Sequence, residues 1–134
     1  MKTIRVLCCC LLIFGIIAMS GCGSFEYLHS NDQIDVRPFN MREDRFCLAA
    51  IEDFPSDKYL GEVLTAEDAI MHAEKEWVTL YGDEVLNDKP YAVYYDAEMD
   101  VWFVRGSLPD GYKGIVARIL IQKDDGKILA VWRG

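Results

Sequence analysis

Four strand-like segments separated by short turn sequences fill the last third of the chain, and they constrain its fold more than any other feature. The segments are PYAVYY, VWFVRGSL, GIVARILIQK and KILAVWR, beginning at Pro90. They are rich in β-branched and aromatic residues, and the intervening DAEMD, PDGYKG and DDG supply turn chemistry. Because short connections join antiparallel neighbours, we predict a curved antiparallel four-stranded meander sheet.

The segment ahead of these strands carries the clearest helix pattern. Thr65 is placed to cap a helix, and Glu67 and Asp68 put negative charge in its first turn. Gly82 suits the position after the last turn. We therefore predict a helix from about residue 66 to 81, with one apolar stripe packed on the sheet. The stripe consists of Ala66, Ala69, Ile70, Ala73, Trp77, Leu80 and Tyr81.

A weaker periodicity between residues 41 and 54 indicates a second, shorter helix. Phe46, Ala50 and Phe54 follow one another at intervals of four, with Cys47 and Ile51 alongside. An α+β domain results, in which one or two N-terminal helices pack on one face of the sheet. The other face is expected to be a concave pocket or a surface for a partner.

The N-terminus has the pattern of a signal peptide. Lys2 and Arg5 precede an apolar run of 14 residues from Val6 to Met19. Such a run spans only about 21 Å as a helix, short of the roughly 30 Å hydrocarbon core of a bilayer. The following MSGC resembles the bacterial lipobox, which directs lipidation of its cysteine, here Cys22.

These signals divide the chain into a signal peptide at 1–21, a lipidated tether at 22–40 and a single domain at 41–134. We expect the lipid to hold the protein on the extracytoplasmic side of the cell envelope. Gly23 after the cysteine favours the outer membrane in an organism with two membranes. An ordinary secretory signal cut near Ala18 or Gly21, and an uncleaved anchor, are the alternatives.

The charge of the mature chain narrows the choice of partner. Removal of Lys2 and Arg5 from the 14 Lys and Arg leaves 12 of them against 22 Asp and Glu, a net charge of −10. Such a surface repels phosphate backbones, so nucleic-acid binding is not expected. A cationic protein partner is electrostatically favoured.

Residues that carry chemistry are sparse. Once Cys22 is lipidated, Cys47 is the one cysteine of the mature chain, which excludes an internal disulfide and favours a buried small hydrophobe. His29 and His72 have no companions for a metal site or a catalytic triad, and no Gly-rich phosphate loop follows a strand. We therefore predict no catalytic site, metal or cofactor.

An acidic cluster between the first two strands raises two further hypotheses, a calcium site and a catalytic pair. Asp96, Glu98 and Asp100 lack the glycine and terminal glutamate of a calcium loop, which favours a solvated hairpin tip. Asp96 or Asp100 beside a tyrosine would be the working pair of an enzyme, if this fold held one.

Several strings resemble a family of bacterial immunity proteins with a nuclear-transport-factor-2-like (NTF2-like) fold. The most specific is the strand pattern W-x-V-x-G-x-LP; LTAEDAIMHAEKEW, DKPYAVYY and IQKDDGKILAV accompany it. The pattern is carried by Trp102, Val104, Gly106, Leu108 and Pro109. Departures from the family lie at Gly114-Ile115, where two glycines are usual, and at the Trp132-Arg133-Gly134 end. The resemblance implies an α+β, NTF2-like or cystatin-like domain that binds a toxin and is not an enzyme.

These inferences combine into one functional hypothesis and two alternatives. A lipid-anchored protein would neutralise a toxin by direct stoichiometric binding, and the negative charge favours a basic toxin. A small envelope module that restrains a peptidase, and a pocket-bearing enzyme of the same fold, are the alternatives. The candidate partner-binding residues, chosen at loop tips and at the C-terminus, are Tyr94, Asp96, Glu98, Tyr112 and Trp132.

Overall fold

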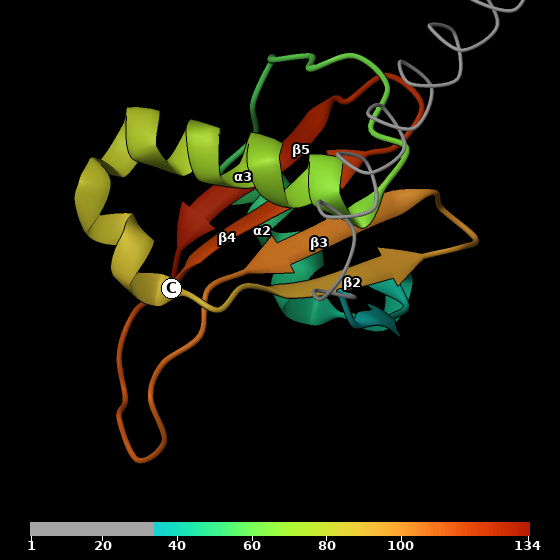
Figure 1. The fold of residues 1–134 in the computed structure, drawn as a ribbon. Helices are drawn as coiled ribbons and strands as arrows, with labels where there is room; N and C mark the ends of the chain where they lie inside the picture. Colours follow the sequence, from blue (N-terminus) through green and yellow to red (C-terminus); the bar gives the residue numbers. More distant parts are fainter. Residues whose placement is uncertain (1–33) are drawn as a thin grey trace, which may run out of the picture. The chain divides into compact units, whose positions relative to one another are not determined.

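The computed structural model describes residues 34–134, which form an α+β unit of nine elements (Figure 1). With η for a 3-10 helix, these are β1 (Val36–Pro38), η1 (Met41–Glu43), α2 (Arg45–Asp53), α3 (Ala66–Tyr81), η2 (Asp83–Asp88), β2 (Ala92–Asp96), β3 (Val101–Arg105), β4 (Ala117–Gln122) and β5 (Ile128–Arg133). The predicted signal peptide and Cys22 lie outside the described residues. Within residues 34–134, no helix is long and apolar enough to cross a membrane.

The sheet has five strands in the order β1-β2-β3-β4-β5, so the prediction of four was wrong. β2 to β5 are antiparallel neighbours, as expected of a meander, but β1 adds a parallel edge in which Val36 pairs with Val93. A three-residue edge strand has no readable periodicity, and its exposed side chains resemble those of a tether. The folded unit therefore begins by Ile34, earlier than the predicted boundary at residue 41.

Helix α3 confirms the bounds predicted from its caps. Thr65 Oγ1 accepts a hydrogen bond from Asp68 N at 3.1 Å, and Gly82 ends the helix with a φ of 82°. Most of the predicted stripe is buried, including Trp77, which is fully enclosed. Leu80, placed on the same stripe, is half-exposed, although Val78 and Tyr81 in the same last turn pack against the core.

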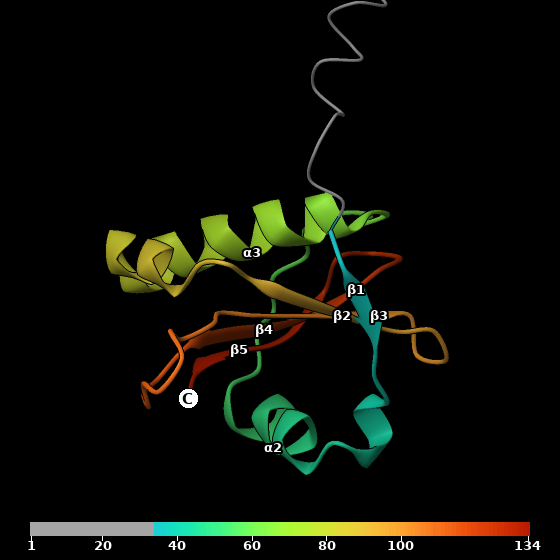
Figure 2. The ribbon, with the colours of Figure 1, turned by 60° about the horizontal axis from the view of Figure 1, so that its bottom comes forward.

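Helices cover both faces of the sheet, with α3 on one side and α2 on the other (Figure 2). Under α3, Trp77 packs against buried residues such as Trp102, whose indole N–H donates to Val63 O at 2.8 Å. Under η1 and α2 a second cluster includes Met41, Cys47 and Ala50. Helix α2 therefore covers part of the second face of the sheet. The sequence had instead predicted that the helices pack on one face.

Helix α2 presents a different side to the sheet from the one expected. Cys47 and Ala50 are buried, whereas Phe46 is 79% exposed and Phe54 is also exposed. Asp44 caps the helix, its Oδ1 accepting from Phe46 N and Cys47 N at 3.0 Å each. The small Cys47 and Ala50 side chains permit a close approach to the sheet, which two phenylalanines would prevent.

Candidate partner-binding surface

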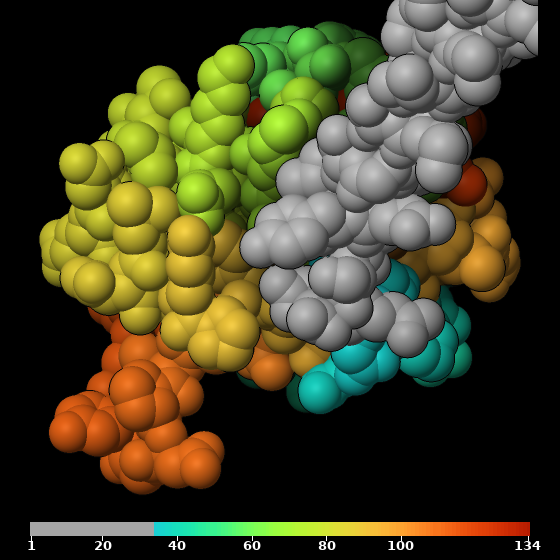
Figure 3. All heavy atoms as spheres, viewed as in Figure 1, coloured from blue at the N-terminus to red at the C-terminus, as the bar shows by residue number. Residues whose placement is uncertain are grey.

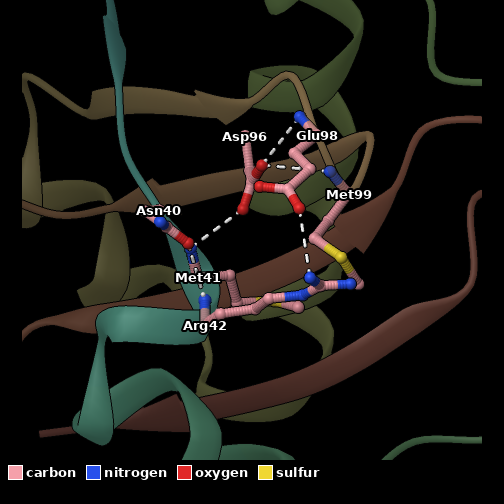
Figure 4. A network of polar contacts seen from close by, with 6 residues as sticks. All are labelled: Asn40, Met41, Arg42, Asp96, Glu98 and Met99. Carbon is pink, nitrogen blue, oxygen red and sulfur yellow. Dashed lines mark hydrogen bonds and ion pairs between the residues drawn. The ribbon is translucent and has the colours of Figure 1, made fainter.

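Asp96 joins the end of β2 to the segment that leads into α2 (Figure 4). Its Oδ2 accepts from Met41 N at 2.9 Å, and its Oδ1 accepts from Glu98 N at 2.9 Å and Met99 N at 3.0 Å. The residue is 3% exposed. A carboxylate with three backbone donors is a structural clamp between the β2–β3 turn and η1.

The charge state of Asp96 follows from these contacts. Burial by itself raises the pKa of the carboxyl group, but the three backbone donors and the nearby Arg42 together hold the pKa of Asp96 below its ordinary value. Asp96 is therefore ionised at neutral pH and enclosed. The prediction that Asp96 belongs to a solvated hairpin tip was wrong, because an isolated stretch of sequence does not show a distant backbone donor such as Met41 N.

Glu98 lies beside this clamp, and its side chain points toward Arg42 (Figure 4). Its Oε1 accepts from Arg42 Nη1 at 3.1 Å, and both side chains are about two-thirds exposed. Asn40 Oδ1 also accepts from Arg42 N at 3.1 Å, which fixes the start of η1. Glu98 is therefore accessible to a partner. Its ion pair with Arg42 lies on the surface and contributes little to stability.

A groove of about 420 Å³ runs between α2 and the sheet face beneath it. Its lining includes a row of aromatic rings in which Tyr94 stacks on Phe103 at 5.5 Å between centroids. Phe103 in turn stacks on Trp132 at 6.2 Å. The complete lining is Phe39, Asp44, Phe46, Cys47, Tyr94, Phe103, Arg105, Arg118 and Trp132.

Two of the predicted partner-binding residues, Tyr94 and Trp132, meet in this groove. Tyr94 is partly exposed; its hydroxyl accepts from Arg105 Nη2 at 3.2 Å, and the Arg105 guanidinium lies 5.7 Å from its ring centroid. Trp132 is only 7% exposed and belongs to the second core cluster. The expectation that Trp132 forms an outer surface was therefore wrong, since the side chain packs into the second core cluster.

Tyr112 lies apart from the groove, in the loop of residues 106–116 that joins β3 to β4. This loop projects from the body of the domain (Figure 3). Tyr112 is 72% exposed, and Leu108 and Ile115 in the same loop are 38% and 61% exposed. Three large apolar side chains on one protruding loop are typical of a contact surface. The five predicted residues thus occupy three places: the groove, the β2–β3 turn and this loop.

Sequence analysis missed Arg105 and Arg118, which line the groove from adjacent strands. The two residues are direct partners in the β3–β4 pairing. Strand alternation carries the signal, because Arg105 shares its side of β3 with Phe103, and Arg118 shares its side of β4 with Leu120. Two arginines that lie on the same side of neighbouring strands as core residues indicate the edge of a buried face.

A second cavity, of about 980 Å³, lies between α3 and the β1–β2 edge. Ile70, Met71 and Tyr91 give it an apolar wall, and Glu74 and Lys89 lie at its rim. Tyr91 Oη donates to Glu74 Oε2 at 2.8 Å, and Lys89 Nζ lies 3.2 Å from the same oxygen. The hydrogen bond from Tyr91 is the main cause that lowers the pKa of Glu74. The rim charges are therefore paired with one another.

The acid–tyrosine pair considered for catalysis also has a structural role. Tyr95 Oη donates to Asp100 Oδ1, and burial followed by this contact raises the pKa of Tyr95 to about 12. The phenol therefore stays protonated at neutral pH. Neither residue lines the groove or the cavity beside α3.

The remaining nucleophile and the metal-ligating residues add no reactive centre to residues 34–134. Cys47 is buried, and burial, then the nearby Asp44, raise the pKa of its thiol to about 12. The thiol is thus a packed, protonated group, as expected of a small hydrophobe. In this part of the chain no three His, Cys, Asp or Glu side chains are grouped to hold a metal ion.

One comparison with known proteins gives a match. Residues 68–134, which comprise all of α3 after its first two residues and the whole of β2 to β5, match the family model described as NTF2 fold immunity protein. No curated protein and no solved structure matches the chain. The matching half of the chain contains the groove arginines, most of the aromatic row and the exposed β3–β4 loop.

Proposed function

This chain belongs to the family of NTF2-fold immunity proteins, and we propose that it neutralises a toxin by binding it in a fixed stoichiometry, without catalysis. Membership of this family implies a protein partner. The observation that carries the proposal is the match over residues 68–134. It covers strands β2 to β5, the β3–β4 loop and the sheet side of the groove, whereas β1 and the α2 side of the groove lie before it.

The accessible surfaces support a binding role. Phe46 at the groove and Tyr112 on the β3–β4 loop are 79% and 72% exposed, although burial of each ring would be favourable. Aromatic side chains of this kind are enriched in the energetically important parts of protein interfaces. The polar clusters at Asp96 and Tyr95 are engaged in holding the fold.

We further propose that the protein acts from the cell envelope through lipid on Cys22. The support comes from residues 1–22, in which two basic residues, an apolar run and the MSGC sequence follow one another. With the signal removed, the net charge of −10 would attract a basic toxin over long range and repel nucleic acid.

Co-expression tests the neutralisation directly. A toxin encoded next to this gene is produced with and without the full-length chain, and survival is measured. We expect rescue, and calorimetry of the purified pair should give a single integral stoichiometry with no change in the covalent structure of the toxin. Survival without complex formation, or modification of the toxin at substoichiometric amounts of the chain, would contradict the proposal. Inhibition of a neighbouring peptidase in place of a toxin would favour the peptidase-restraining alternative.

A further inference from the structure

We infer that the groove between α2 and the sheet receives a carboxylate side chain of the toxin, bound between Arg105 and Arg118. This inference rests on the proposed function and specifies the chemistry of the contact. It differs from the expectation based on net charge, because a local positive site within an acidic protein selects an acidic group of the partner.

The first observation is the placement of two like charges side by side. Arg105 and Arg118 are direct cross-strand partners, and both are only partly exposed. Like charges in this arrangement destabilise a sheet. Within residues 34–134 neither arginine forms an ion pair. Asp44 lines the same groove, but it lies beyond ion-pair distance of both guanidinium groups.

The second observation is an unmet donor. Arg118 Nε is enclosed and has no hydrogen-bond partner, and a buried donor left without one costs free energy. Arg105 already donates one hydrogen bond to the Tyr94 hydroxyl. Asp44 is the acid among the lining residues, and its Oδ1 is occupied by the two backbone donors at the start of α2. The enclosed Nε shows that residues 34–134 do not engage the Arg118 guanidinium there, and an incoming carboxylate would bind the part of that guanidinium that lines the groove.

The walls of the groove indicate which groups of the partner would lie next to that carboxylate. Arginine binds carboxylates through two parallel N–H donors, which gives directionality as well as strength. Tyr94, Phe103 and Trp132 offer aromatic surface for the aliphatic part of a glutamate or aspartate side chain. Phe46, 79% exposed at the same groove, provides an apolar rim that a protein surface would cover and that a small free anion would leave in water.

A small carboxylate tests the chemistry of the site without requiring the toxin. Full-length chain labelled with ¹⁵N is titrated with phenylacetate, and the arginine Nε–H signals are followed by NMR. We expect the signals of Arg105 and Arg118 to shift, and phenylacetamide, which has the same shape without the charge, to leave them unchanged. Arg118→Gln and Arg105→Gln should each weaken phenylacetate binding about tenfold or more. Absence of any shift with phenylacetate would overturn the proposal.

Arg133→Gln is the matched control, because Arg133 also has an enclosed Nε without a partner but packs over Tyr81 at 5.4 Å, away from the groove. We expect this variant to bind phenylacetate as the wild type does. Melting temperatures of the two groove variants should stay close to that of the wild type, since removal of one like charge relieves the repulsion between Arg105 and Arg118. If one groove variant fails to fold, the other carries the test.

Binding measurements with the toxin test whether the carboxylate belongs to the partner. Arg105→Gln and Arg118→Gln should weaken toxin binding about tenfold or more and Arg133→Gln should not, and amide substitution of one acidic residue of the toxin should reproduce the loss. Phenylacetate binding combined with unchanged toxin affinity in both groove variants would overturn the assignment to a partner. If the wild-type chain binds no toxin, the proposed function fails, and the phenylacetate titration still decides whether the groove takes a carboxylate.

Discussion

Asp96 and Met41 are 55 positions apart in the chain, and the carboxylate of Asp96 accepts a hydrogen bond from the backbone N–H of Met41 at 2.9 Å. This contact fastens the segment before α2 to the end of β2. It fixes the position of the helix that forms one wall of the groove. Asp96, which the sequence placed among the partner-binding candidates, therefore holds one wall of the groove in place.

Substitution of Asp96 should destabilise the domain. In Asp96→Asn one acceptor oxygen is replaced by an NH₂ group, so at least one of the three backbone donors, which are buried or part-buried, loses its partner, at a cost of about 1–3 kcal/mol. Urea denaturation measures the loss. Glu98→Gln is the control, because its exposed ion pair with Arg42 contributes less than about 1 kcal/mol. Equal effects of the two substitutions would contradict the clamp.

The same carboxylate should make the stability depend on acid. Because the pKa of Asp96 in the folded state lies below its ordinary value, its stabilising effect is complete above the unfolded pKa of about 3.9. The effect is lost as the pH falls through the folded pKa. Urea midpoints of wild type and Asp96→Asn should therefore converge as the pH is lowered below about 4. A difference that stays constant down to pH 2 would show that charge plays no part.

Gly106, from the most specific string of the family resemblance, should not tolerate a side chain. A Cβ at this position would lie 2.6 Å from Asp88 Cβ, and Asp88 Oδ2 accepts from Ala117 N at 3.1 Å in the interior. Gly106→Ala should cost about 1–3 kcal/mol by overpacking. Gly114→Ala provides the comparison, since its Cβ would meet Leu108 at an ordinary 3.6 Å. A neutral Gly106→Ala would mean that Asp88 can move.

Trp77 should be the largest single contributor from α3. Its side chain is fully buried, and its indole N–H donates to Arg118 O at 3.3 Å. Trp77→Ala should cost about 3–5 kcal/mol by creating a cavity, a large part of the stability of a small domain. Leu80→Ala, on the same predicted stripe but half-exposed, should cost much less. Chemical denaturation of both variants would rank them, and a reversed order would contradict the position of the helix.

Lipidation should depend on Cys22, the cysteine of the MSGC sequence. Cys22→Ser should abolish metabolic labelling with a palmitate analogue and release the protein from membranes, because the lipid is the proposed anchor. Cys47→Ser leaves the predicted lipidation sequence intact and should be labelled like the wild type. Membrane fractionation with labelling in the Cys22→Ser variant would refute the anchor, and a sucrose gradient would identify the membrane.

Local interactions are the part of this structure that the sequence determined by itself. The bounds of α3 follow from Thr65 and Gly82, whose capping contacts involve only neighbouring residues. The antiparallel strands β2 to β5 follow from turn residues between segments of high β propensity, although the β3–β4 connection is a longer loop of residues 106–116. The family resemblance, now supported over residues 68–134, depends on strings within these same elements.

The tertiary structure alone decided the features that depend on residues far apart in the chain. Strand β1 exists because β2 offers it an edge, and the side of α2 that is buried depends on the sheet face it meets. Asp96 is a clamp only because Met41 N reaches it, and Arg105 and Arg118 form one site only because β3 and β4 pair in that register. Contacts across the chain leave no periodic trace in a sequence, so folding had to bring these residues together before their roles could be recognised.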